Sequence, residues 1–102
     1  MKEKLLHLPL KKEWFNMIES GEKKEEYREI KGYWISRICK SKKLRSGFCC
    51  EDVDTDITRV CFSYGYTKKR MTLPVKRIYI GYGKIEWGAP KLDKVFIIEL
   101  DI

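Results

Sequence analysis

The chain has 102 residues and a formal net charge of +7, with 43% hydrophobic and 36% charged residues. This length predicts a single domain over residues 1–102, and the apolar content is that of a globular protein, which argues against a disordered chain. The excess of lysine and arginine favours polyanionic partners, nucleic acid first, although a soluble protein with a lysine-rich surface explains the same charge.

The sequence contains no window that approaches 18 consecutive apolar residues, so we expect no membrane-spanning helix. Its N-terminus lacks the apolar run and cleavage site of a signal peptide, and we therefore expect a cytoplasmic, monomeric protein with reduced cysteines. The four cysteines include no CxxC pair, and His7 is the single histidine. This pattern predicts no metal site and no cofactor, and it disfavours Ser-His-Asp and Cys-His catalysis.

The first half of the chain predicts two strands and two short helices. Residues 4–8 form the first strand, which we expect to end at Pro9. The first helix is indicated by apolar residues at helical spacing, with Gly21 at its end: Leu10, Trp14, Met17 and Ile18. A polar strand over residues 23–30 follows, and a second helix runs from Gly32 through Cys39.

The second half predicts three strands. Residues 46–56 are expected to form a mobile loop, and residues 57–64 and 70–80 alternate as strands, with a phase shift near Arg77 that predicts a bulge. Residues 95–100 are a continuous apolar run and the expected most buried strand. Five strands, two early helices and mostly consecutive strands favour an α+β fold, in which a mixed or antiparallel sheet curls into a small barrel and so removes its edges.

The segment from Gly21 to Arg28, GEKKEEYR, is charged on both faces although it stands where a strand should enter the fold. A strand normally has apolar side chains on its core face, so this segment is either an exposed ribbon or the wall of a polar cleft. Alternation places Lys24, Glu26 and Arg28 on one face, and Lys23 on the other.

The charged side chains suggest specific chemistry. Lys23 is a compact cation that could meet a phosphate, or act as a base if burial lowers its pKa. Arg28 offers a planar fork that suits a phosphate or a carboxylate, and Glu26 could hold that fork or read a base amine. The alternative is that Glu26 and Arg28 pair only to support the fold, which leaves a ligand site and a scaffold both open.

The spacing of Gly21, Lys23, Glu26 and Arg28 matches the GxKxxExR signature of the ASCH domain, a branch of the PUA-like superfamily. Residues 8–15 before the motif also resemble small bacterial and phage ASCH proteins. The same is true of Tyr33-Trp34, of residues 83–90 and of residues 95–98, so that the resemblance omits mainly residues 40–56. The resemblance implies a curled barrel with flanking helices and a motif-lined cleft that binds RNA or a nucleotide.

Hydrolysis is the alternative activity that the resemblance implies. Some relatives hydrolyse the amide of acetylated cytidine and some are described as ribonucleases, but such activities do not follow from a fold. The hydrolytic branch is expected to pair the motif lysine with a threonine nucleophile where this chain has Glu26. Glu26 could instead activate water beside Lys23, with Glu86 as a second candidate carboxylate.

Further candidate ligand contacts lie outside the motif. If two basic clusters flank the cleft, they would form a track for a phosphate backbone; otherwise they are solvated charge runs. The clusters are Lys40, Lys42, Lys43 and Arg45, and Lys68, Lys69 and Arg70. The first could instead dock an acidic protein partner. Tyr66 and Trp87 lie in expected loops and are candidates for stacking on bases, although aromatic residues in a small domain are more often core.

Overall fold

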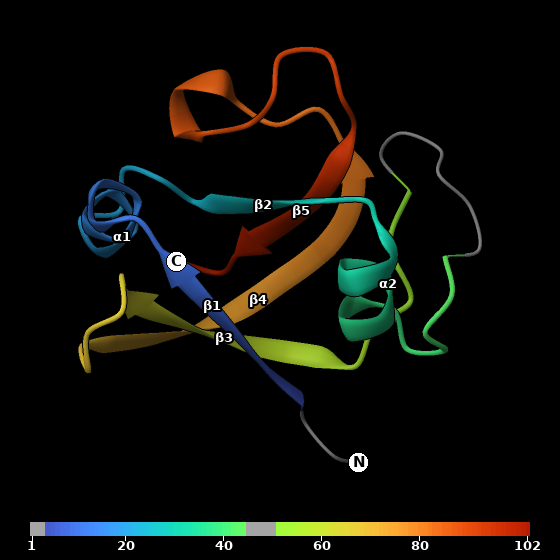
Figure 1. The fold of residues 1–102 in the computed structure, drawn as a ribbon, viewed down its shortest axis with the longest axis horizontal. Coiled ribbons are helices and arrows are strands. Elements are labelled where there is room, and N and C mark those ends of the chain that lie inside the picture. Colours follow the sequence, from blue (N-terminus) through green and yellow to red (C-terminus); the bar gives the residue numbers. More distant parts are fainter. Residues whose placement is uncertain (1–3, 45–50) are drawn as a thin grey trace.

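The computed structural model describes residues 4–44 and 51–102, which form five strands and two α-helices around one curled sheet (Figure 1). The elements in chain order are β1 (Lys4–Leu10), α1 (Lys12–Glu19), β2 (Glu25–Glu29), α2 (Gly32–Ile38), β3 (Ile57–Tyr64), β4 (Arg70–Gly81), the 3-10 helix η1 (Ile85–Trp87) and β5 (Val95–Leu100). The strand order is β1-β3-β4-β5-β2. β1 runs parallel to β3 and the other neighbours are antiparallel, so the sheet is mixed.

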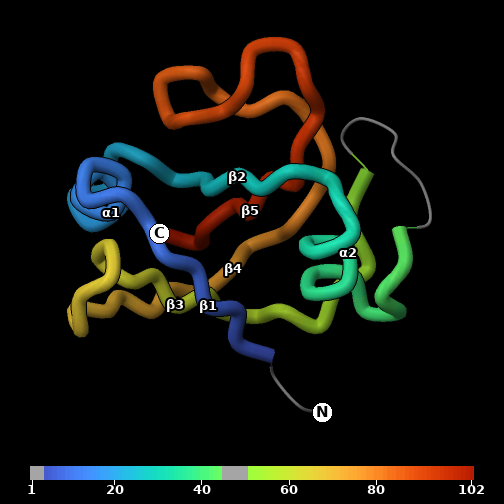
Figure 2. Tube along the Cα trace, in the orientation of Figure 1, coloured from blue at the N-terminus to red at the C-terminus, as the bar shows by residue number. Residues whose placement is uncertain are grey.

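The sheet curls into a half-barrel whose two end strands, β1 and β2, face each other across an open side (Figure 2). This arrangement confirms the expected α+β class, with a small curled mixed sheet of five strands and two helices. The helices lie at opposite sides of the curl, and the long β4–β5 connection rises beyond β2 in the same view (Figure 1). The charged segment therefore sits on an end strand of the sheet, next to a loop.

The core fills the inside of the curl. β1 alternates, with Leu6, Leu8 and Leu10 buried, as expected for a strand with one face toward the core. α1 contributes Phe15 and Ile18, both nearly inaccessible to solvent. β5 carries four consecutive buried residues from Val95 to Ile98, which confirms it as a strand covered on both faces.

The predicted end of the first strand was wrong. β1 continues through Pro9 to Leu10, which pairs with Tyr64 and is buried in the sheet instead of starting the helix. Pro9 is tolerated because β1 is an end strand: its carbonyl points away from β3, so the missing N–H removes no sheet hydrogen bond.

Two other expectations about strands have clear outcomes. A register shift between Val75 and Arg77 confirms the irregularity expected in β4. The polar strand is shorter than predicted, because residues 23 and 24 precede β2.

Residues 46–50 of the expected loop lie outside the described residues, while residues 51–56 partly pair with β4 through the Val53 N–H and the Ile78 carbonyl, 2.9 Å apart. Within the described ranges, every helix is too short or too polar to cross a membrane.

Candidate functional site

The ion pair of Glu26 and Arg28 caps the free edge of β2. β2 bonds to β5 on one side, and on the other side the Tyr27 backbone points toward the open side of the half-barrel. The Tyr27 N–H donates to Glu26 Oε1 at 3.2 Å, and the Tyr27 carbonyl accepts from Arg28 Nη1 at 2.7 Å. Arg28 Nη2 then donates to the Pro9 carbonyl of β1 at 3.3 Å. Charged side chains thus replace part of the backbone ladder that would close the barrel.

Lys23 reaches the same cluster from outside the strand. Gly21, with φ of +86°, turns the chain out of α1, and the Lys23 N–H donates to the Met17 carbonyl at 3.0 Å. Alternation placed Lys23 on the face opposite Glu26, and this prediction was wrong. Lys23 Nζ lies 2.8 Å from Glu26 Oε1, because residue 23 belongs to the turn and strand periodicity does not apply to it.

The Lys23 ammonium is enclosed on all sides. The residue is 1% exposed, and Nζ donates to Glu26 Oε1 and, at 2.5 Å, to the Trp87 carbonyl. Nζ also lies 4.5 Å from the centre of the Trp14 ring, within cation–π range. Burial lowers the pKa of Lys23, and the neighbouring Glu26 carboxylate opposes that shift. The ammonium is therefore a buried cation whose neighbours already use its donors.

Glu26 is the shared acceptor of this cluster. It is 5% exposed and holds three donors, from Lys23 Nζ, the Tyr27 N–H and, at 3.0 Å, Arg28 Nη1. In residues 4–44 and 51–102, every buried side-chain nitrogen and oxygen has a hydrogen-bond partner. A buried carboxylate with two cations and a backbone donor is fully compensated, so this part of the motif carries a structural role.

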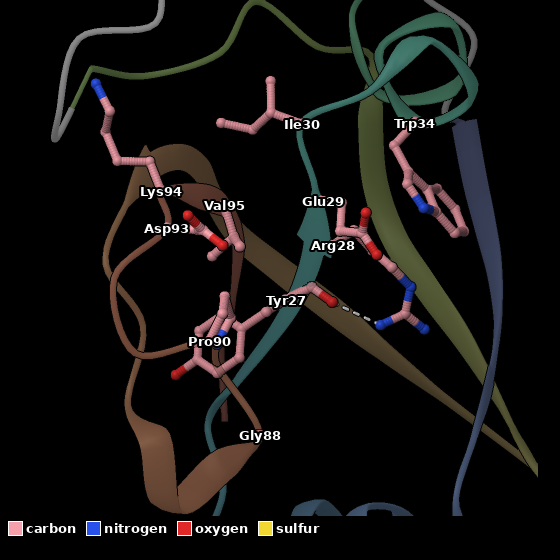
Figure 3. Close-up of a pocket in the computed structure, with 10 residues that line it drawn as sticks. All are labelled: Tyr27, Arg28, Glu29, Ile30, Trp34, Gly88, Pro90, Asp93, Lys94 and Val95. Carbon is pink, nitrogen blue, oxygen red and sulfur yellow. Dashed lines mark hydrogen bonds between the residues drawn. The ribbon is translucent and has the colours of Figure 1, made fainter.

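An open cleft of about 730 Å³ lies beside β2, and Arg28 is the motif residue on its wall (Figure 3). Consecutive residues from Tyr27 to Ile30 line it, and the β4–β5 connection, the first residue of β5 and α2 supply the rest. In Figure 3 the side chains form two groups on either side of β2, with Arg28 and Trp34 on one side and Pro90 and Val95 on the other. The lining residues are Tyr27, Arg28, Glu29, Ile30, Trp34, Gly88, Pro90, Asp93, Lys94 and Val95.

Arg28 is positioned to bind an anion in this cleft. Its side chain is 16% exposed, and its guanidinium carbon lies 5.3 Å from the centre of the Trp34 ring. Nη1 uses both protons on Glu26 and Tyr27, and Nη2 uses one on Pro9. Against the part of the chain that the structure describes, Nε–H and the second Nη2–H make no hydrogen bond. Glu26 therefore orients the guanidinium, and these contacts leave two of its five N–H donors unused.

The opposite wall is held by a tyrosine network. Glu25 accepts hydrogen bonds from the hydroxyls of Tyr27, at 2.8 Å, and Tyr79, at 3.2 Å. The Tyr27 hydroxyl also accepts from the Lys84 N–H at 3.0 Å. Burial raises the pKa of both phenols, that of Tyr79 to about 12, and the Glu25 carboxylate adds to the shift. Gly83 packs so closely that a Cβ there would lie 2.4 Å from the Tyr27 ring.

The described residues of the two basic clusters lie outside the lining of the cleft. Lys68 and Lys69 lie in the β3–β4 turn and Arg70 begins β4, on the α1 side of Figure 1. Lys42 and Lys43 follow α2 on the other side of that view, and Arg45 lies outside the described residues. The described members of both clusters are exposed, and none of them lines the cleft. The phosphate track across both clusters therefore stays a prediction.

The candidate loop residues are likewise scattered. Tyr66 is fully exposed at the β3–β4 turn, away from the cleft. Glu86 is exposed on η1 and does not line the cleft. Trp87 contributes its carbonyl to Lys23, while its ring lies 4.2 Å from Lys84 Nζ. Trp87 therefore joins the motif cluster through its backbone carbonyl. The prediction that its ring stacks on a base stays a prediction.

Sequence reasoning missed most of the cleft lining, notably Trp34, Pro90 and Asp93. Trp34 and Pro90 fall within the segments that resemble the ASCH pattern, and this resemblance could have indicated them. No sequence pattern indicated Asp93.

Among the described residues, no group of three or more His, Cys, Asp and Glu side chains is arranged to hold a metal ion. Comparisons with known protein families, curated proteins and solved structures gave no match to this chain.

Proposed function

We propose that this protein binds single-stranded RNA, or a free nucleotide, in the cleft beside β2. The observation that carries the proposal is the Arg28 guanidinium, which is held by Glu26, lines an open cavity and has N–H donors that the described residues do not use. Unused guanidinium donors suit the oxygens of a phosphate. The volume of about 730 Å³ falls within the ~300–1,000 Å³ typical of small-molecule sites.

Aromatic and apolar surface on the wall suits a planar base. Trp34 lies beside the guanidinium, and the apolar side chains of Ile30, Pro90 and Val95 line the cleft as well. Stacking of a base on an aromatic side chain contributes ~1–3 kcal/mol and tolerates different sequences. The net charge of +7 favours a polyanion over a neutral ligand. The resemblance of the Gly21-to-Arg28 segment to the ASCH motif, which is taken to line a nucleotide site, supports the same proposal.

The test is a titration with a short oligouridylate and with uridine monophosphate at several salt concentrations. Arg28→Gln should weaken binding about tenfold and reduce the salt slope, because one phosphate contact is lost. Arg37→Gln is the matched control, since Arg37 is an exposed arginine on α2 that does not line the cleft. Thermal melting of each variant separates loss of binding from loss of fold. Absence of salt-dependent binding at low ionic strength would refute the proposal.

Hydrolysis of a modified nucleoside or of RNA is the second candidate, and the lowered pKa of Lys23 beside Glu26 favours it. A substrate would have to displace the Trp87 carbonyl or the Trp14 ring to reach Nζ. Glu86 could assist only if the loop that carries it moved. Incubation with acetylated cytidine and with RNA tests this candidate, and turnover that is unchanged in Lys23→Ala would eliminate the assigned role of the lysine.

A further inference from the structure

The β4–β5 loop, residues 82–94, forms one wall of the cleft, and its position needs an explanation. It contributes Gly88, Pro90, Asp93 and Lys94 to the lining. Its only regular structure is the short η1, and in Figure 1 it rises away from the sheet. A connection of this kind opens at low cost unless other elements hold it. The contacts that hold it therefore decide the width of the cleft.

The first anchor is Lys23. Its Nζ donates to the Trp87 carbonyl at the end of η1, and the Trp14 ring covers the same nitrogen. Gly88 follows with φ of +98°, and a Cβ there would lie 3.2 Å from the Trp14 ring. The lysine, the indole and the glycine thus form one close-packed joint between the start of β2 and the loop.

The second anchor is Tyr27. Its hydroxyl accepts the Lys84 N–H just before η1, and its ring lies against Gly83, where any side chain would collide with it. Tyr27 therefore contacts the residue before η1, and Lys23 contacts the last residue of η1. Both come from the charged segment of the chain and both are buried, and of the two only Tyr27 also lines the cleft.

We propose that Lys23 and Tyr27 are positioning residues, which hold the β4–β5 loop as a wall of the cleft, and that Lys23 makes no contact with the ligand. This inference rests on the proposed binding function of the cleft. In this arrangement Glu26 holds Lys23 Nζ beside the loop and holds the Arg28 guanidinium beside the cleft. The two basic residues of the motif therefore have different roles: Lys23 holds the loop in place, and Arg28 binds the ligand.

The first experiment compares Lys23→Met with Lys24→Met by amide hydrogen exchange. Lys24 is the exposed neighbour and serves as the control. Loss of a hydrogen bond from a charged donor should raise exchange at the amides of residues 87–89 about tenfold or more. These amides bond within the loop, at 2.9–3.1 Å, so they report its opening. The core amide of Val60 reports global unfolding, so an increase at residues 87–89 that exceeds the increase at Val60 is the expected sign of loop opening, and equal increases would overturn the inference.

The second arm measures oligouridylate binding by the same two variants at several salt concentrations. Lys23→Met should weaken binding while the dependence of log K on log salt keeps its slope, because no phosphate contact is removed. A direct contact would instead lower the slope by about 0.7 for a single strand. Unchanged loop exchange, unchanged affinity despite a loosened loop, or a reduced slope would each overturn the inference. If the unaltered protein binds no oligouridylate, the proposed function fails, and the exchange arm still decides whether the anchors hold the loop.

A second pair of variants keeps the inference testable if Lys23→Met does not fold. Tyr27→Phe and Tyr79→Phe each remove one phenol hydroxyl that donates to Glu25, but only the Tyr27 hydroxyl also accepts the Lys84 N–H. Tyr27→Phe should therefore speed exchange of the Lys84 amide and weaken oligouridylate binding, and Tyr79→Phe should do neither. Equal behaviour of the two variants would overturn the role of Tyr27.

Discussion

Replacement of Glu26 by alanine should cost more stability than any other single carboxylate removal on β2. Glu26 is 5% exposed and compensates the buried cation of Lys23 as well as Arg28. Removal of one partner from a buried ion pair costs about 3–5 kcal/mol, because the other charge is left without compensation. A domain has a total unfolding free energy of about 5–15 kcal/mol, so the expected loss is a large fraction of it.

The effect should be measured by urea denaturation and by thermal melting followed by circular dichroism. At about 4–8 °C per kcal/mol, the expected loss lowers Tm by roughly 12–40 °C. Glu29→Ala is the matched control on the same strand, since Glu29 is 76% exposed and its ion pair with Lys31 spans 3.8 Å. Such a surface pair contributes about 0–1 kcal/mol, so the control should melt close to the unaltered protein.

A double variant tests the electrostatic cause. Lys23→Met combined with Glu26→Gln removes the buried cation together with its partner, so the double variant should be more stable than the sum of the two single losses predicts. Additive losses, or a Glu26→Ala variant that loses less than about 1 kcal/mol, would refute the view that a compensated buried ion pair holds this part of the fold.

Two further predictions concern the tyrosine network behind the cleft. Gly83→Ala should lower Tm and weaken ligand binding because its Cβ would lie 2.4 Å from the Tyr27 ring, whereas Gly32→Ala, with open space around it, should do neither. The free energy of unfolding should fall as pH rises above 10, because the unfolded phenols ionise near that pH while the pKa of Tyr79 is raised to about 12 and that of Tyr27 is raised as well. Denaturation at pH values on both sides of 10 checks this, and Tyr79→Phe should flatten the fall; an unchanged pH profile would contradict it.

Local patterns in the sequence predicted much of the sheet. Ile57–Tyr64 and Val95–Leu100 have the bounds that alternation and the apolar run indicated, since turn residues flank both segments. The predicted first strand ended too early, at Pro9. A sequence does not show that β1 lies at the end of the sheet, where a proline removes no hydrogen bond. Alternation also placed Glu26 and Arg28 on one face, where they form an ion pair at 3.0 Å.

The amino-acid sequence by itself determined where the five strands lie, although not all of their bounds, and that Glu26 and Arg28 share one strand face, because side-chain periodicity is a local property. Only the tertiary structure decided that Lys23 is enclosed and Arg28 faces a cleft. The Trp87 carbonyl that binds Lys23 is 64 residues away along the chain, and the Pro9 carbonyl that meets Arg28 belongs to the opposite end strand of the half-barrel. Contacts between distant segments depend on how the sheet curls, and no local spacing encodes them.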